Sequence, residues 1–221
     1  MTVISKTFLK IPEVFLMEIG FIGGGHVAQV LASLFINAGH SVVLTNKHGL
    51  DRLKPVIQRL GARAEAGNLA EVARQELIVL ALPYKAIFEL DQTLFNGKAV
   101  VDATNYFPHR DGEFEQLTSH QLASSELVAH HFKGAKIVKA FNTIPVANLE
   151  NLARNVSDDK RIALPIAGDS QVKATVSDLI KQIGFTPYNV GDLKDSLKFQ
   201  ADTPLFLFSG NRNELTAKFA K

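Results

Sequence analysis

The sequence contains no cysteine. This absence excludes disulfides, thiolate nucleophiles, iron–sulfur clusters and zinc sites with thiolate ligands. An excess of one charge is also missing, because 24 basic and 22 acidic residues leave a formal charge of only +2. So small a charge gives no argument for binding to nucleic acid or to an anionic membrane surface.

Long apolar runs are absent as well, since none reaches the roughly 18 residues of a membrane-spanning helix. The first 16 residues lack the layout of a signal peptide, because charged residues and proline interrupt them at Lys6, Lys10, Pro12 and Glu13. We therefore expect a cytoplasmic protein with no membrane partner and no nucleic-acid partner. The content of 46% hydrophobic and 21% charged residues is ordinary for a soluble globular chain.

Apolar segments typical of buried strands alternate with segments of helical periodicity. The clearest strand segment is LIVLAL at 77–82, and residues 27–38 carry apolar side chains at the spacing of one helix face. Further strands are expected at 17–22, 41–44, 99–104 and 135–141, and further helices at 50–60, 84–95 and 124–132. This alternation predicts an α/β fold with a doubly wound, mostly parallel sheet. The polar residues 104–119 predict a surface loop near the ligand edge of that sheet.

The strand expected at 17–22 runs into Gly23-x-Gly25-x-x-Ala28, which opens the next helix. In this setting the pattern predicts a Rossmann-type dinucleotide-binding unit. The first glycine permits a tight turn, the second lets the backbone approach a pyrophosphate, and Ala28 lets the helix pack closely on the strand. The helix N-terminus then offers N–H groups to the phosphates, so we expect His26 to contribute its backbone more than its ring. The alternative is that the glycines serve only the turn.

The end of the second strand indicates which dinucleotide is bound. An NAD-binding unit has an acidic residue about twenty residues after the glycines, bonded to the ribose 2′-hydroxyl. Here Thr45, Asn46 and Lys47 stand at that position, followed by His48. An amide, an ammonium group and an imidazole would hold a 2′-phosphate that a carboxylate would repel. We therefore expect NADP(H), with a solvated turn after an edge strand as the alternative.

Residues 81–83 (ALP) end the strand that begins at Leu77, at the carboxyl edge, where ligands bind in open α/β sheets. Pro83 either fixes the chain under the nicotinamide ribose or only ends the strand. Tyr84 either shields the nicotinamide ring or caps the next helix. No Ser-His-Asp or paired-carboxylate pattern is present, and we assign no catalytic side chain, because hydride transfer needs stacked rings rather than a nucleophile. We also expect no metal site, since His130 and His131 point about 100° apart on a helix.

Several segments resemble a known family. The chain is similar from about residue 17 to its end to the NADPH-dependent coenzyme F420 reductases and to the cytoplasmic oxidoreductase domain of the STEAP metalloreductases. The segments that carry this resemblance are IGFIGGGHVAQVLA, TNKHGL, VLALPYKAI, VVDATNYF, KAFNTIPVANL and IAGDSQVKATVSDLIKQIGFTPYNVGDLKDS. The most specific of them are FNTIP at 141–145 and the stretch from Gly168 to Phe185.

The resemblance implies a Rossmann domain with a small C-terminal helical part, often dimeric, that moves a hydride between NADP(H) and a flavin or deazaflavin. It implies NADP contacts at Gly24, Gly25, His26, Val27, Asn46, Lys47, Ala81, Leu82, Pro83 and Ala140, and an acceptor pocket at Asn142, Thr143, Ile144 and Pro145. The expected cofactor is NADP(H), with FMN, FAD or coenzyme F420 as acceptor. The expected partners are a small-molecule acceptor and a second copy in a homodimer.

Two departures bear on the acceptor. An F420 reductase of this type has histidine at the position of Asn142, whereas the STEAP domains have asparagine there. The STEAP proteins also continue into a membrane haem domain, so we expect this chain to pass electrons to a free flavin or a separate partner. Two other functions stay open: a reductase of a small carbonyl or imine, which would want Tyr84 or His109 as proton donor, and a non-catalytic NADP(H)-binding sensor.

We expect three segments in all. Residues 1–16 form an N-terminal extension, because members of the family begin at a methionine that matches Met17. Residues 17–142 form the NADP-binding Rossmann domain. Residues 143–221 form a smaller C-terminal part, which packs on the same sheet and completes the acceptor site.

Overall fold

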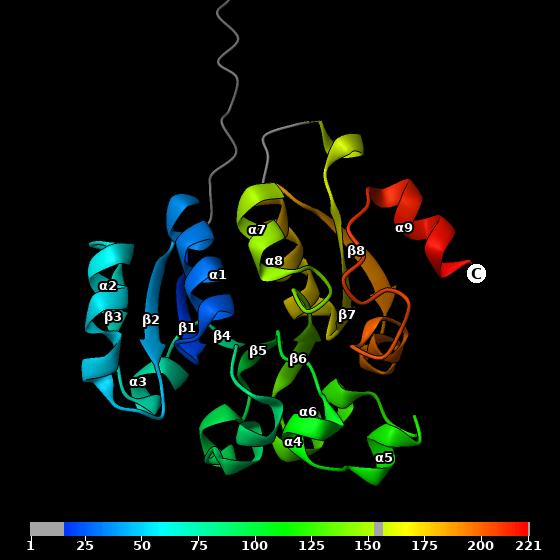
Figure 1. Ribbon diagram of the computed structural model, residues 1–221. Helices are drawn as coiled ribbons and strands as arrows, with labels where there is room; N and C mark the ends of the chain where they lie inside the picture. The colour runs from blue at the N-terminus through cyan, green and yellow to red at the C-terminus, as the bar shows by residue number, and fades with distance from the viewer. Residues whose placement is uncertain (1–15, 153–156, 221) are drawn as a thin grey trace, which may run out of the picture.

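The computed structural model describes residues 16–152 and 157–220, so the expectation for residues 1–15 lies outside the described part of the chain. One eight-stranded sheet forms the centre of the molecule, with the strand order β3-β2-β1-β4-β5-β6-β7-β8 (Figure 1). Its strands are β1 (Glu18–Ile22), β2 (Ser41–Thr45), β3 (Ala64–Ala66), β4 (Leu77–Leu80), β5 (Ala99–Asp102), β6 (Lys136–Lys139), β7 (Ala163–Gly168) and β8 (Thr186–Gly191).

The first six strands are parallel, and β7 pairs antiparallel with β6 while β8 is parallel to β7. The predicted Rossmann-type, mostly parallel sheet is therefore confirmed. The strands near the centre, such as β4 with four buried residues, are apolar throughout because helices cover both of their faces. The strands β7 and β8 extend the sheet that carries the glycine loop.

The helices divide between the two faces of the sheet. One apolar core lies under α1 (His26–Asn37), α2 (Lys54–Leu60), α7 (Val146–Leu152) and α8 (Ser170–Gln182). The other lies under α3 (Leu69–Ala73), η2 (Tyr84–Glu89), η3 (Gln92–Phe95), α5 (Glu115–Thr118) and α6 (Ser124–His131). The remaining short elements are η1 (Leu50–Leu53), α4 (Pro108–Asp111), η4 (Asp158–Lys160), η5 (Leu193–Phe199) and the C-terminal α9 (Arg212–Phe219).

Two local expectations are confirmed only in part. The helix expected over 84–95 is instead a pair of 3-10 helices, because Leu90 and Asp91 are extended and the Asp91 carboxylate accepts hydrogen bonds from the Thr93 N–H and hydroxyl. The segment expected as a surface loop at 104–119 is mostly exposed, but it contains the short helices α4 and α5 and buries Asp111 and Leu117.

The buried His40 links the residue before β1 to the end of α8. The Met17 N–H donates to His40 Nδ1 at 3.1 Å, and His40 Nε2 lies 2.6 Å from Gln182 Oε1 at the end of α8. Because Nδ1 accepts, the ring carries its proton on Nε2 and donates it to the glutamine. The start of β1 is thus tied to the C-terminal part of the chain.

None of the helices within the described residues is long and apolar enough to cross a bilayer.

Candidate functional site

The predicted site residues gather at one edge of the sheet. The strands β1, β2, β4, β5 and β6 run parallel, so the loops that follow them emerge side by side (Figure 1). This carboxyl edge is where ligands bind in open α/β sheets. The five loops contain the residues at 23–28, 45–48, 81–84, 103–107 and 140–145.

Gly23 and Gly25 meet different constraints in the loop after β1. Gly23 has a φ of +124°, and a Cβ placed on it would lie 2.0 Å from the Ala81 carbonyl oxygen, so the fold itself requires glycine. Gly25 has an ordinary φ of −76°, and a Cβ built there would have no atom of the described chain within 4 Å apart from its own neighbours along the chain. The missing side chain at Gly25 leaves open space, as expected where a ligand comes close to the backbone.

The N-terminus of α1 opens onto this space. Among the described residues no side chain caps the helix at Gly25, and its first turn holds no acidic residue. The first N–H groups of a helix have no partner inside the helix, and they carry its positive dipole end. The His26 side chain is exposed, Val27 is half-buried and Ala28 is buried against the sheet. This arrangement suits a pyrophosphate.

The segment after β2 lies beside the glycine loop. Thr45 is buried, and its carbonyl oxygen accepts the Gly23 N–H at 2.9 Å, so Thr45 supports the loop through its backbone. Asn46 turns the chain, because its Oδ1 accepts the His48 N–H at 2.8 Å. That bond leaves the Asn46 amide nitrogen as a donor, 3.3 Å from a Cβ built on Gly24. Lys47 and His48 are exposed.

The loop after β4 is fixed by the sheet. The Ala81 N–H donates to the Ile22 carbonyl at 2.9 Å, Leu82 is half-buried and Pro83 is exposed. Tyr84 begins η2, and its side chain is fully buried.

The burial of Tyr84 removes it from the set of residues that reach an acceptor. Its hydroxyl donates to the Ser124 carbonyl at 2.7 Å, and its ring packs against Phe88, Tyr106 and Phe114. Burial, with the Asp102 charge as a lesser cause, raises the pKa of this hydroxyl. The side chain neither shields a ring at the carboxyl edge nor supplies a proton there, contrary to its place among the expected substrate contacts.

The loop after β6 is tightly packed. Ala140, Asn142, Thr143 and Ile144 are buried, and Pro145 is half-buried just before α7. Phe141 has a φ of +63°, a strained conformation for a residue other than glycine. Strain of this kind clusters at ligand sites, and here it turns the chain between β6 and Asn142.

Asn142 connects the loops after β5 and β6 with the end of η5. Its Nδ2 donates to the Phe199 carbonyl at 3.0 Å and to Asn105 Oδ1 at 3.3 Å, while Asn105 Nδ2 donates to the Asn142 carbonyl at 3.0 Å. The remaining atom, Asn142 Oδ1, is buried with no partner among the described residues. An unpaired buried acceptor is costly, so this atom is suited to a donor on a bound ligand.

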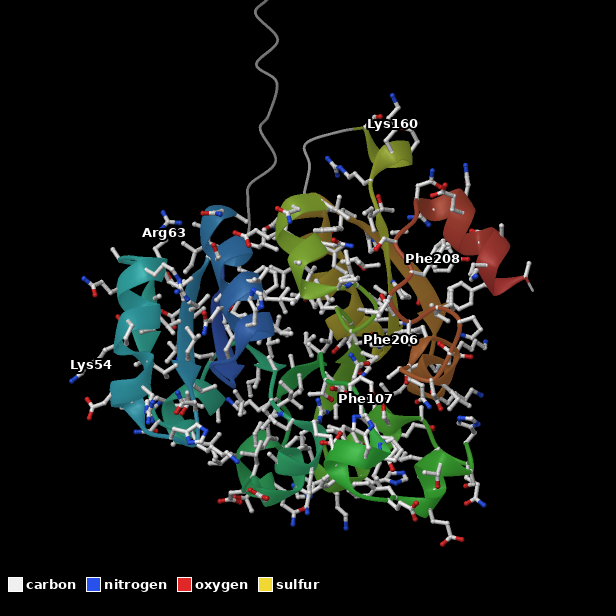
Figure 2. All side chains as sticks on the ribbon, in the orientation of Figure 1. Lys54, Arg63, Phe107, Lys160, Phe206 and Phe208 are labelled. Carbon is white, nitrogen blue, oxygen red and sulfur yellow. The ribbon has the colours of Figure 1, made fainter. Side chains whose placement is uncertain are left out.

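The C-terminal part approaches the same edge. Besides the bond from Asn142 to Phe199, the rings of Phe107 and Phe206 lie edge to face with centroids 6.0 Å apart (Figure 2). The Arg110 guanidinium covers the Phe107 ring at 5.0 Å. The segment after η5 therefore lies against the loop after β5.

Sequence reasoning missed a buried ion pair beneath these loops. Asp102 and Lys139 end β5 and β6, and Lys139 Nζ lies 3.1 Å from Asp102 Oδ2 with both side chains fully buried. Burial alone would raise the pKa of Asp102, but Lys139 and the hydroxyls of Ser125 and Thr104 outweigh it and hold that pKa below its usual range. Burial lowers the pKa of Lys139, and Asp102 opposes that shift.

The helix α6 supplies a further partner to this pair. Ala123 is the N-cap of α6, and its N–H donates to Glu126. Ser125 lies in the first turn, and its hydroxyl donates to Asp102 Oδ2 at 2.6 Å. The signal in the sequence was a charged residue that ends each strand directly after a run of two or three apolar residues.

The histidines form no evident metal site. Within residues 16–152 and 157–220, no group of three His, Asp or Glu side chains could hold a metal ion. His131 lies 3.2 Å from the Leu90 carbonyl, and His109 is exposed on α4.

Several known proteins are similar to this chain in sequence or fold. Residues 18–106 match the family model described as NADP oxidoreductase, coenzyme F420-dependent. The chain is 30% identical over 83% of its length to a metalloreductase, STEAP3, of Rattus norvegicus, of which it spans only 36%. It is 28% identical over 71% of its length to an F420-dependent NADP reductase of Methanocaldococcus jannaschii, of which it spans 73%.

A solved structure matches over nearly its whole length. It is a hypothetical protein of Sinorhizobium meliloti, 30% identical, with a TM-score of 0.77. The match covers 88% of this chain and 95% of that one.

Proposed function

We propose that the chain is a member of the coenzyme F420-dependent NADP oxidoreductases, whose family model matches residues 18–106, and that it transfers a hydride between NADPH and a flavin- or deazaflavin-like acceptor. The observation that carries the proposal is the open cradle at Gly25 beside a helix N-terminus and a strand end without a carboxylate. These three features together suit a dinucleotide with a 2′-phosphate.

Each part of the cradle has a binding role in this proposal. The backbone N–H groups from Gly25 to Val27 hold the pyrophosphate, and the side chains of Asn46, Lys47 and His48 hold the 2′-phosphate. Ala81, Leu82, Pro83 and Ala140 line the nicotinamide end, where they orient the ring and exclude water. When bound, NADPH supplies the hydride, so the protein needs to provide position rather than a nucleophile.

The acceptor side consists of the loop after β6. Asn142, Thr143, Ile144 and Pro145 shape it, and the unpaired Asn142 Oδ1 is available to a ring N–H or amide donor. A flavin or deazaflavin ring carries such donors, and its flat shape suits stacking on the nicotinamide. We further propose that the chain works as a homodimer in the cytoplasm with a small-molecule acceptor.

The reduction of a carbonyl or imine is supported less well. Such a reaction needs a proton donor beside the acceptor, and the Tyr84 hydroxyl is buried and bonded to the backbone. His109 is exposed and its ring lies 5.8 Å from that of Phe107, on α4 rather than on the loop after β6. Hydride transfer to a ring system places no such demand.

The test is a panel of acceptors offered to the protein with NADPH: FMN, FAD, coenzyme F420, a cyclic imine and a small aldehyde. We expect oxidation of NADPH with at least one of the three flavin-type acceptors. Turnover with the imine or aldehyde alone would favour the carbonyl or imine reductase. Tight NADPH binding without turnover by any acceptor would favour the sensor.

The variant Asn142→Leu assigns the acceptor side. It should raise the acceptor KM or lower kcat by about tenfold while leaving NADPH affinity near that of the unmodified protein, since one hydrogen bond to a ligand is worth about that much. Asn37→Leu, on the exposed end of α1, is the control. Loss of NADPH binding alone would move Asn142 to the cofactor side.

A further inference from the structure

The ion pair of Asp102 and Lys139 holds a single residue, Thr104, by all of its polar groups. Asp102 Oδ1 accepts the Thr104 N–H at 2.9 Å and the Thr104 hydroxyl at 2.6 Å. Lys139 Nζ donates to the Thr104 carbonyl at 2.6 Å. With Ser125 and Lys139 on Oδ2, the Asp102 carboxylate has four donors, and none of these groups is exposed to more than 3%.

The next residue carries this constraint to the acceptor side. Asn105 follows Thr104 directly, and its side chain exchanges two hydrogen bonds with Asn142, at 3.0 and 3.3 Å. Its carbonyl accepts from Arg110 Nη2 at 2.7 Å. Thr104, held by the ion pair, restrains Asn105 through the backbone, and Arg110 restrains Asn105 through its carbonyl. The position of Asn142 therefore depends on both Thr104 and Arg110.

Stability alone does not account for an ion pair at this place. Charges that are fully buried lose their hydration, and a pair of well-packed apolar side chains is often as stable or more stable. The strands β5 and β6 are otherwise apolar where they face α6, as Val100 and Ile137 are, so apolar residues would continue their pattern. Apolar residues would leave the three polar groups of Thr104 without partners.

We propose that Asp102 and Lys139 are positioning residues for the reaction: they clamp Thr104 and thereby set Asn105 and Asn142 at the acceptor side. This inference rests on the proposed function for its effect on turnover. Its effect on the loops does not depend on which acceptor is used.

The test separates positioning from stability with one double variant. Lys139→Met alone leaves a buried, unpaired carboxylate and should lower the melting temperature strongly. Asp102→Leu combined with Lys139→Met removes both charges and should restore the melting temperature close to that of the unmodified protein. The double variant should still show kcat lowered about tenfold or more, with NADPH affinity changed by less than about threefold. Lys173→Met is the matched control, because Lys173 also donates to a backbone carbonyl, that of Gly191, but within the described part of the chain it makes no hydrogen bond to Asp102, Thr104, Asn105 or Asn142.

A second pair of variants serves if the double variant does not fold. Thr104→Val removes only the hydroxyl bonded to Asp102, whereas Thr104→Ser keeps it. We expect Thr104→Val to lower kcat and Thr104→Ser to restore most of it. Equal kcat in Thr104→Val and the unmodified protein would overturn the proposal, as would unchanged kcat in a folded double variant.

Amide hydrogen exchange supplies the readout that needs no acceptor. The double variant should exchange faster at 103–106 and 141–145 than the unmodified protein, and at β1 and β2 the two should match. Unchanged exchange at those loops overturns the clamp. Failure of the unmodified protein to oxidise NADPH with any acceptor would instead contradict the proposed function and leave this measurement decisive for the clamp.

Discussion

Gly23 and Gly25 lie two positions apart in one loop, and glycine is needed at each of them for a different physical reason. Gly23 has a positive φ and touches the Ala81 carbonyl, so any side chain there clashes with the backbone of the next loop. Gly25 has a φ that every residue adopts and faces open space. The turn therefore depends on Gly23, and the approach of a phosphate depends on Gly25.

This difference predicts the result of replacing Gly25. Gly25→Val should fold with a melting temperature close to that of the unmodified protein, because the free protein has room for the side chain. It should lose measurable dinucleotide binding in calorimetry, because the side chain fills the space of the pyrophosphate. Gly23→Val is the contrasting variant and should fail to fold well. A dinucleotide affinity of Gly25→Val close to that of the unmodified protein would contradict the phosphate site and favour the alternative that the glycines serve only the turn.

The position of Lys47 leads us to predict a preference for NADPH over NADH. A charge-assisted hydrogen bond to the 2′-phosphate is worth about 1.5–3 kcal/mol, so NADPH should bind at least about tenfold tighter than NADH at moderate salt. Lys47→Ala should remove most of that difference by weakening NADPH. The difference should also narrow as salt rises, since Lys47 is exposed.

The control for Lys47→Ala is the same substitution at Lys54, whose ammonium group forms a surface ion pair. Lys54 (Figure 2) pairs with Asp51 at 2.6 Å on the exposed surface of α2 and η1. Lys54→Ala should leave the preference for NADPH unchanged. Equal affinity of the unmodified protein for NADPH and NADH would contradict the interpretation of residues 45–48.

The segment between β5 and α6 shows how far the sequence predicts an element. Its polar composition predicted a surface loop, and most of its residues are exposed, but Thr104, Asp111 and Leu117 are buried. Asp111 has a side chain only 1% exposed, and its carboxylate accepts from the Phe107 N–H and from Arg110. Composition reports which residues are polar but not which of them find partners on the same short segment.

Asp111 gives this segment a predictable response to acid. Burial alone would raise the pKa of Asp111, but hydrogen bonds from Arg110, Phe107 and Lys85 outweigh it and lower that pKa. The unfolded chain therefore binds this proton more readily than the folded protein does. The stabilisation is complete above the ordinary aspartate pKa of about 3.9 and is lost as the pH falls through the lower folded value.

Thermal melts from neutral pH down to about pH 3 measure this response. Asp111→Asn should be less stable at neutral pH and should lose less further stability on acidification than the unmodified protein. Asp178→Asn, on the exposed surface of α8, is the control and should follow the unmodified protein. Parallel curves for Asp111→Asn and the unmodified protein would contradict the assignment.

At the scale of the whole molecule, the sequence predicted the features that depend on residues close together along the chain. The glycine loop, the apolar strands and their alternation with helices are local patterns, and they lead directly to the parallel sheet. The ion pair of Asp102 and Lys139 joins residues 37 positions apart. Neither residue alone indicates a buried site, because charged residues are almost never buried without a partner.

The predicted position of the Tyr84 side chain was wrong for a related reason. Its place after the strand β4 predicted a side chain at the ligand edge, but three aromatic rings from η2 and the 106–114 segment enclose it. An aromatic cluster of this kind forms only when the tertiary structure brings its members together. The order of strands places the backbone at the ligand edge and does not determine which way each side chain points.

The most direct test of the account follows the hydride itself. The protein is loaded with NADPH carrying deuterium at the transferring position of the nicotinamide and is mixed rapidly, without oxygen, with coenzyme F420, FMN or FAD. We predict that oxidation of the bound NADPH begins on mixing with at least one of these acceptors, that deuterium slows it, and that coenzyme F420, where it reacts, retains the label after reduction. Bound NADPH that stays reduced with all three acceptors would contradict the account.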